Sequence, residues 1–308
     1  MDKKGIANSI KPISHAEAVA DFVRLNHIDL TKVKGESKIG NKFLDFFTFE
    51  ERLNTCTRKG MNFYEFMDNK EYHARPYIRN LLVYQQNLKV NELTKLYRIY
   101  SLHCGSVALF KPLKAKQIYE HFNPTTVLDP CMGWGGRLVG AVSHKVPHYI
   151  GIDLNVNLKE AYQSMVQTLN ELGGIAPYDP NVPFGTTFLK GCKLTKVDLH
   201  FCDAVGFDYS TIKYDMIFTS PPYFNIELYS HTNKKTKQEW IDQFYKPLFQ
   251  NTFQNLLVGG WMCINVSKVI YESVFIDLFG LASIVIPMTL KVRPKQSQSE
   301  FIYCWKKC

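Results

Sequence analysis

From residue 125 onward, the chain alternates between short apolar runs and segments with helical periodicity. The apolar runs predict strands at 125–128, 148–152, 198–201, 214–218 and 261–266, and the segments between and after them predict helices at 137–143, 158–172, 240–257 and 275–281. Strands that alternate with helices favour a parallel sheet covered on both faces. Two further apolar runs, 284–292 and 301–305, can pair as a hairpin that adds antiparallel strands at one edge. The pattern therefore predicts an α/β fold with a mostly parallel sheet.

The first hundred residues lack this alternation. Residues 17–25 and 91–101 have helical patterning, whereas residues 31–41, rich in lysine and glycine, predict a loop. Between residues 75 and 84, arginines are interleaved with tyrosines, a mixture that can contact phosphates and stack on bases. More often such a mixture is an amphipathic helix whose aromatic residues face the core, and we favour that interpretation. We expect two parts: a mainly helical N-terminal region, 1–104, which is the candidate for substrate or nucleic-acid recognition, and a domain formed by 105–308.

Charge and cysteine usage limit the class of protein. The net charge is +9, which is compatible with a polyanionic partner but does not require one. Eight cysteines are scattered singly, without the spacing of a metal site, so we expect no metal and a reduced, intracellular protein. The N-terminal stretch lacks the apolar segment of a signal peptide, and no apolar run is long enough to span a membrane. We therefore expect a soluble protein without a membrane partner.

Polar or glycine-rich segments follow three successive predicted strands. The first strand leads into DPCMGWGGR at 129–137, where glycines allow a tight turn and close approach of a ligand. The second strand ends at Asp153, an acid that can accept hydrogen bonds from ribose hydroxyls. The third ends at Asp203, which can accept a hydrogen bond from an adenine amino group. Each acid alone is more often a helix cap or a turn residue. Together at one edge of a sheet, they predict a crevice that binds a nucleoside.

The fourth strand leads into TSPPY at 219–223. Two consecutive prolines cannot lie inside a central strand or a helix, and they hold the preceding residue extended. The chain therefore leaves this strand in a stiff shape, with the Pro221 carbonyl held out beside the ring of Tyr223. A rigid acceptor next to a stacking surface suits a flat molecule with an exocyclic amino group, and that predicts a nucleobase.

Taken together, these motifs resemble those of Class I S-adenosylmethionine-dependent methyltransferases, specifically the amino-methylating DNA enzymes that modify cytosine N4 or adenine N6. The resemblance covers about residues 105–308. DPCMGWGG at 129–136 is similar to the family's D-P-x-x-G-x-G motif, and SPPY at 220–223 is similar to its [Ser/Asp/Asn]-Pro-Pro-[Tyr/Phe/Trp] motif. The segment from Phe110 to Pro112 resembles an additional cofactor motif. The resemblance implies a Rossmann-like methyltransferase fold with a seven-stranded sheet and S-adenosylmethionine as cofactor.

The resemblance also implies roles for individual residues. Asp129 and the glycine turn hold the methionine end of the cofactor, while Asp153 binds its ribose and Asp203 its adenine. Ser220 and the Pro221 carbonyl accept hydrogen bonds from the target amine, and Tyr223 stacks on a base flipped out of a duplex. Methyl transfer is then one in-line displacement. The full set comprises the catalytic motif Ser220, Pro221, Pro222 and Tyr223, and the cofactor residues Phe110, Asp129, Pro130, Gly133, Gly135, Asp153, Asp203 and Ala204.

Several alternatives remain at this point. Serine before the two prolines favours cytosine N4 over adenine N6, and we favour DNA as the partner. Methylation of adenine N6 or guanine N2 in RNA, glutamine methylation in proteins, and a cofactor-binding subunit without catalysis are the alternatives. Cys131 lies in the cofactor turn, so we interpret it as a packing residue and not a nucleophile. The basic segment 230–237 is equally compatible with a loop that contacts phosphate and with an ordinary solvated loop.

Overall fold

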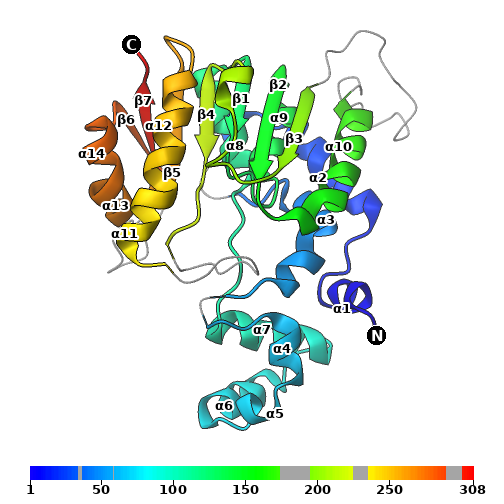
Figure 1. The fold of residues 1–308 in the computed structure, drawn as a ribbon. Coiled ribbons are helices and arrows are strands. Elements are labelled where there is room, and N and C mark those ends of the chain that lie inside the picture. The colour runs from blue at the N-terminus through cyan, green and yellow to red at the C-terminus, as the bar shows by residue number, and fades with distance from the viewer. Residues whose placement is uncertain (34–36, 58, 174–194, 225–234, 289–299) are drawn as a thin grey trace, which may run out of the picture.

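A seven-stranded sheet forms the centre of the structure (Figure 1). The computed structural model describes residues 1–33, 37–57, 59–173, 195–224, 235–288 and 300–308. The strands are β1 (Thr126–Asp129), β2 (His148–Asp153), β3 (Lys196–Phe201), β4 (Met216–Thr219), β5 (Trp261–Ser267), β6 (Ile284–Pro287) and β7 (Glu300–Lys306). Their order is β3-β2-β1-β4-β5-β7-β6. Strands β1 to β5 are parallel, and β7 is antiparallel to both β5 and β6.

This topology confirms the predicted mostly parallel sheet with an antiparallel C-terminal hairpin, which is the Rossmann-like methyltransferase fold. The strand order changes direction between β1 and β4. The crossover connections on the two sides of this point lie on opposite faces of the sheet, and folds of this kind bind ligands there. The register places Val127 beside both Tyr149 of β2 and Met216 of β4. The central strands are buried on both faces, as continuous apolar runs predict.

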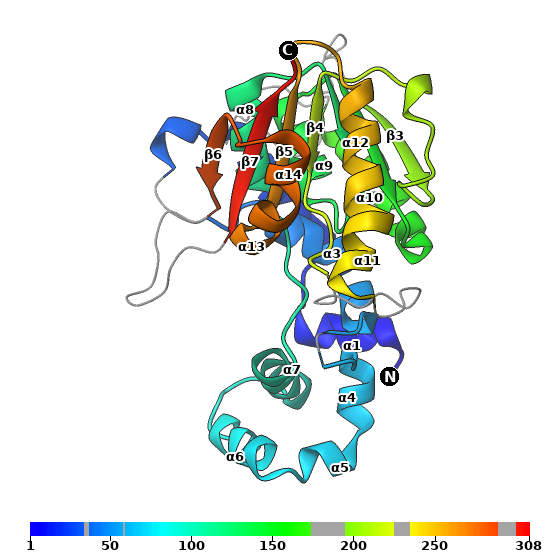
Figure 2. The ribbon, with the colours of Figure 1, turned by 60° about the vertical axis from the view of Figure 1, so that its left-hand side comes forward.

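Helices cover both faces of the sheet, and alternate residues of each strand point to opposite faces (Figures 1 and 2). On one face, Val127 packs with α2 (His15–His27), α3 (Asn41–Asn54), α8 (Pro112–Phe122), α9 (Gly136–His144) and α10 (Lys159–Gly173). On the other, Leu128 belongs to a cluster with α12 (Lys246–Asn255), α13 (Lys268–Ile270) and the π-helical turns η4 (Ile241–Tyr245) and η5 (Tyr271–Phe275). Helices α11 (Lys237–Trp240) and α14 (Ile276–Phe279) flank these turns.

The N-terminal residues form two groups. Helices α2 and α3 share a core with the sheet, so packing crosses the predicted boundary at residue 104. A third core cluster joins α1 (Lys3–Ile10) and the second half of α3, through Phe49 and Leu53, to α4 (Phe63–Asp68), α5 (Lys70–His73), α6 (Pro76–Gln85) and α7 (Glu92–His103). Helices α4 to α7 form a lobe beyond the edge of the sheet toward which the parallel strands point (Figures 1 and 2). Short 3₁₀ turns complete the structure at η1 (Leu30–Lys32), η2 (Val156–Leu158) and η3 (Tyr209–Thr211).

Three segments differ from, or extend beyond, what the sequence predicted. The predicted helix 240–257 exists, but a π-helical turn interrupts it at Ile241–Tyr245. Residues 289–292 of the predicted strand 284–292 lie outside the described residues. The interleaved segment 75–84 does form a helix, α6, but the expectation that its aromatic residues face the core is wrong, because Tyr77 is 56% and Tyr84 75% exposed. Within the described ranges, no helix is both long and apolar enough to cross a membrane.

Candidate active site

A pocket of about 470 Å³ lies at the carboxyl ends of the parallel strands. Ten of the twelve predicted site residues line it, namely Phe110, Pro130, Gly133, Asp153, Asp203, Ala204, Ser220, Pro221, Pro222 and Tyr223. Asp129 and Gly135 are not among its lining residues. Because neighbouring strands lie about 4.8 Å apart, the ends of β2 and β4 are about 10 Å apart across β1. The pocket can therefore hold one elongated ligand that reaches from the acids to the Pro-Pro motif.

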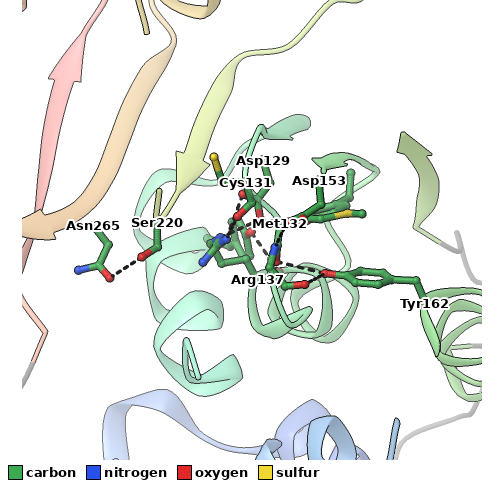
Figure 3. A network of polar contacts seen from close by, with 11 residues as sticks. Asp129, Cys131, Met132, Arg137, Asp153, Tyr162, Ser220 and Asn265 are labelled. Carbon is green, nitrogen blue, oxygen red and sulfur yellow. Dashed lines mark hydrogen bonds and ion pairs between the residues drawn. The ribbon is translucent and has the colours of Figure 1, made fainter. Parts of the chain in front are cut away.

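The glycine turn after β1 is held by contacts that other segments make with its backbone. Gly133 has a φ of +54° and Gly135 of +84°, conformations that residues with a side chain rarely adopt. The hydroxyl of Tyr162 on α10 donates to the Met132 carbonyl at 3.1 Å (Figure 3). The same hydroxyl lies 2.9 Å from the Gly133 carbonyl oxygen. At Gly136, a Cβ atom would lie 1.9 Å from the carbonyl oxygen of Phe110. The turn thus touches the segment before α8, and both line the pocket.

Asp129 ends β1, directly before the glycine turn. Its side chain is fully buried and accepts a hydrogen bond from Arg137 Nε at 2.7 Å (Figure 3). It also accepts one from the Tyr149 hydroxyl at 2.6 Å. Arg137 also donates to the Cys131 carbonyl, which ties the ion pair to the turn. The Asp129 carboxylate is thus engaged by buried partners that support the turn, and its contact with the methionine end of the cofactor stays a prediction.

Asp153 lies at the end of β2 with both carboxylate oxygens directed toward backbone amides. Gly133 N–H donates to Oδ2 at 2.7 Å and Asn155 N–H to Oδ1 at 2.9 Å. Burial raises the pKa of Asp153, while these two amides act in the opposite direction. A carboxylate has about four lone-pair positions, so two remain for a ligand. Asp153 is therefore suited to accept hydrogen bonds from a pair of adjacent hydroxyls.

Asp203 and Ala204 follow β3 on the same side of the pocket. Asp203 is exposed, and its Oδ1 accepts a hydrogen bond from Val205 N–H at 2.9 Å. Ala204 is buried next to it. The two acids and the turn form one end of the pocket, as the order of strand ends predicts.

The other end contains Ser220, whose hydroxyl donates to Asn265 Oδ1 at 3.1 Å (Figure 3). The amide of Asn265 donates in turn to the Phe301 carbonyl at 3.2 Å, which fixes its oxygen toward Ser220. Because the serine proton is engaged, the lone pairs of Ser220 Oγ remain available to a donor in the pocket. Asn265 lines the same pocket. This chain of contacts makes Ser220 an acceptor.

A hydrogen bond from a neighbouring helical turn fixes the proline pair. The hydroxyl of Tyr245, in the π-helical turn η4, donates to the Pro222 carbonyl. Among the described residues, none donates to the Pro221 carbonyl. Tyr223 is half-buried, and its hydroxyl lies 3.3 Å from the Asn265 carbonyl. The motif therefore offers two neighbouring acceptors, Ser220 Oγ and the Pro221 carbonyl, with an aromatic ring beside them.

Sequence reasoning did not identify Asn265 or Tyr245, and it included Gly136 and Arg137 only as members of the glycine-turn motif. Asn265 had a usable signal, since it is the single amide side chain in the buried apolar strand β5. The role of Gly136 depends on a segment that lies 26 residues earlier, and no local pattern reveals that contact. The π-helical turn also brings Gln243 and Phe244 to the pocket wall. Such turns are frequent at functional sites.

Two other sequence expectations concern side chains near the pocket. Burial raises the pKa of the Cys131 thiol well above its usual value, so it is protonated and a poor nucleophile at neutral pH. Of the basic segment 230–237, residues 230–234 lie outside the described residues. Lys235 lines the pocket, and Thr236 caps α11. Across the described part of the chain, no group of three or more histidine, cysteine or acidic side chains is placed to hold a metal ion.

No protein-family model matches the chain, and no curated protein matches its sequence. Similar solved structures include TrmN from Thermus thermophilus, with 14% identity, a TM-score of 0.38, and coverage of 64% of this chain and 49% of that one. A SAM-dependent O-methyltransferase from Thermotoga maritima has 12% identity, a TM-score of 0.41, and coverage of 68% and 71%. The 16S rRNA N2 G1207 methyltransferase of T. thermophilus, solved with AdoMet and guanosine, has 14% identity, a TM-score of 0.40, and coverage of 67% and 45%. The chain spans about half the length of two of these three proteins.

Proposed function

We propose that this chain is an S-adenosylmethionine-dependent methyltransferase that methylates an exocyclic amine of a base in DNA, with cytosine N4 favoured over adenine N6. The pair of acceptors at the end of β4 carries this proposal. Ser220 Oγ has its proton engaged by Asn265, and Pro221, the next residue, lines the same pocket. An amino group has two hydrogens to donate, so two neighbouring acceptors match it.

The opposite end of the pocket fits the nucleoside part of S-adenosylmethionine. Asp153 retains lone pairs for the two ribose hydroxyls, and Asp203 accepts from the adenine amino group. The backbone of the turn around Gly133 holds the methionine end. About 10 Å separates the ends of β2 and β4, which lets the ribose end and the target amine occupy one cavity.

When bound, S-adenosylmethionine supplies a methyl group on a sulfonium sulfur, with a neutral thioether as leaving group. The amine of a base is a weak nucleophile because its lone pair is delocalised into the ring. Hydrogen bonds to Ser220 and Pro221 favour a tetrahedral nitrogen whose lone pair points at the methyl carbon. The N–C bond forms as the C–S bond breaks, and one amine proton passes to solvent. The protein contributes positioning and aligned acceptors, with Tyr223 stacking on the base.

The choice of base and of nucleic acid rests on the motif and on charge. Serine before the two prolines is the residue that favours cytosine N4 by resemblance to the amino-methyltransferases. The net charge of +9 supports a polyanionic partner. DNA is the partner we favour, and its target base enters the pocket unstacked from its neighbours.

The test incubates the purified chain with radiolabelled S-adenosylmethionine and separate pools of DNA, RNA and protein. We expect label in DNA, and we expect the Ser220→Ala variant to lose most of that transfer while it still binds the cofactor. Label only in RNA would replace the DNA assignment by RNA base methylation. Cofactor binding without transfer to any pool would contradict the enzymatic proposal and favour a non-catalytic subunit.

A further inference from the structure

Helix α6 presents tyrosine and arginine side chains to solvent. Tyr77 is 56% and Tyr84 75% exposed, and Arg75 and Arg79 are exposed as well. The fully buried Ile78 packs into the third core cluster and fixes the rotation of the helix. These tyrosines are therefore held outward by the packing of the helix. We refer to Arg75, Tyr77, Arg79 and Tyr84 as the α6 surface.

The charge of this part of the chain is complementary to a polyanion. Residues 69–104 contain six lysines and arginines but two glutamates, a net charge of +4 in 36 of the 308 residues, while the whole chain carries +9. One of the two glutamates, Glu92, is paired with Lys95 at 2.7 Å. Within the described residues, Arg75 and Arg79 form no ion pair with a carboxylate. Their positive charge is therefore available to phosphates.

Contacts with α5 and α7 hold the start of α6 in place. The Arg75 guanidinium lies over the ring of Tyr72, 4.0 Å from its centre. The Tyr72 hydroxyl is 2.9 Å from His103 Nε2, and the ring of Tyr77 lies 5.5 Å from that of His103. Arg75 and Tyr77 are thus positioned before any ligand arrives, which lowers the entropic cost of binding.

A short segment connects His103, which contacts the α6 surface, to the pocket. His103 ends α7, and Ala108, five residues later, lines the pocket. Five residues span at most about 18 Å, which corresponds to roughly five stacked nucleotides at 3.4 Å each. A strand whose target base enters the pocket can therefore reach Tyr77 with a nearby nucleotide. Figure 1 places α6 and α7 on the side of the sheet where the strands end.

We propose that the α6 surface binds single-stranded DNA next to the target base, with bases stacked on Tyr77 and Tyr84 and phosphates at Arg75 and Arg79. The two tyrosines are seven residues apart, so they lie on the same side of the helix. Arg79 lies on the opposite side of its exposed surface. A helix is about 10–12 Å wide, so a DNA strand that lies across α6 can contact the tyrosines and Arg79 together. Unpaired bases expose the faces that an aromatic ring needs, whereas a duplex hides them. This inference rests on the proposed function, because it assigns the substrate of that pocket.

The test measures binding of a fluorescently labelled 20-nucleotide single-stranded DNA by anisotropy, without S-adenosylmethionine. Replacing Tyr77 and Tyr84 together by alanine weakens binding by roughly 5- to 150-fold per tyrosine that stacks on a base. Tyr84→Phe retains the ring and binds as the unmodified chain does. Arg79→Ala weakens binding and reduces the slope of log K against log salt by about 0.7, the value for one phosphate contact on a single strand. Arg24→Ala, an exposed arginine on α2, is the matched control and leaves binding unchanged.

The outcomes separate this inference from the proposed function. Unchanged DNA binding in the Tyr77/Tyr84 double variant, with its fold confirmed by circular dichroism, overturns the stacking role. Binding of an RNA of the same sequence but not of the DNA overturns DNA as the occupant. Tyrosine-dependent DNA binding without methyl transfer supports the α6 surface and contradicts the proposed function alone.

Discussion

The side chain of Asn265 on β5 holds the Ser220 hydroxyl as a hydrogen-bond donor, across 3.1 Å, at the end of the neighbouring strand β4. The amide of Asn265 is itself fixed by the Phe301 carbonyl of β7. Three adjacent strands thereby determine which way the lone pairs of one serine point. This relationship makes the residue before the two prolines an acceptor of hydrogen bonds.

Replacing Asn265 by alanine should lower the rate of methyl transfer more than it lowers cofactor affinity. Without its acceptor, the Ser220 hydroxyl can turn its proton toward the target amine, so we expect kcat to fall about 10- to 100-fold, as for the loss of a hydrogen bond of about 1.5–3 kcal/mol. Asn265→Asp keeps an oxygen facing Ser220 and should recover part of the rate. Steady-state kinetics with a separate cofactor titration measures both effects. Equal rates for the alanine variant and the unmodified chain would contradict this role.

Gly136→Ala should disrupt cofactor binding through the segment before α8. The added Cβ would lie 1.9 Å from the Phe110 carbonyl oxygen, so the pocket-lining segment around Phe110 must move. We expect at least about a tenfold loss of affinity for S-adenosylmethionine, since each tenfold corresponds to only 1.4 kcal/mol. Gly206→Ala is the control, because an added Cβ there meets no atom within 4 Å. Calorimetric titration of both variants would decide, and equal affinities would contradict the proposed contact.

Arg137→Met should destabilise the fold strongly. It leaves the carboxylate of Asp129 fully buried without its cationic partner, and loss of one member of a buried ion pair costs about 3–5 kcal/mol in the free energy of unfolding. The matched control is Lys268→Met, which removes an exposed pair with Glu272 at 3.6 Å and should cost less than about 1 kcal/mol. Urea unfolding of the two variants measures the difference. A cost at Arg137 no larger than at Lys268 would be inconsistent with the buried network.

The affinity for S-adenosylmethionine should decrease in acid, and Asp153 should be the cause. Burial raises the pKa of this carboxyl, so it is protonated at a higher pH than an ordinary aspartate and then loses its negative charge toward the ribose hydroxyls. Affinity is therefore highest above the folded-state pKa and falls as the pH drops through it. Asp153→Asn should bind weakly at every pH, with a flat profile over the same range. Parallel pH profiles for both proteins would refute the assignment.

The stability of the fold should increase in mild alkali because of Lys116. Its ammonium donates to the carbonyls of Leu25 at 2.7 Å and Asn26 at 2.8 Å, at the end of α2, and burial lowers its pKa to about 8. Between pH 8 and the unfolded-state pKa of 10.5, the unfolded chain binds more protons at this site than the folded chain. The contribution of Lys116 to the free energy of unfolding therefore rises with pH in this window. Chemical unfolding at pH 7.5 and pH 10 should show this rise relative to Lys116→Met, and an identical pH dependence would contradict it.

The sequence predicted what depends on local pattern and failed where distant segments meet. The alternating apolar runs predicted the sheet. The motifs at the ends of the predicted strands contain ten of the twelve expected site residues, and these ten line one pocket. The buried network around Asp129 could not be predicted, because a motif residue that supports a turn and one that contacts a ligand have the same spacing in sequence. Only the structure reveals its buried partners, Arg137 and Tyr149. The exposure of Tyr77 was missed because periodicity gives the faces of a helix but not the side on which its neighbours pack.

The position of the transferred methyl group tests the central claim most directly. The chain is incubated with DNA and S-adenosylmethionine that carries a deuterated methyl group, and the digested nucleosides are analysed by mass spectrometry against standards. The account predicts label on an exocyclic amine, as N4-methylcytosine, and its loss in Ser220→Ala. Label on a ring carbon or on an oxygen, or no labelled nucleoside from a chain that binds the cofactor, would contradict it.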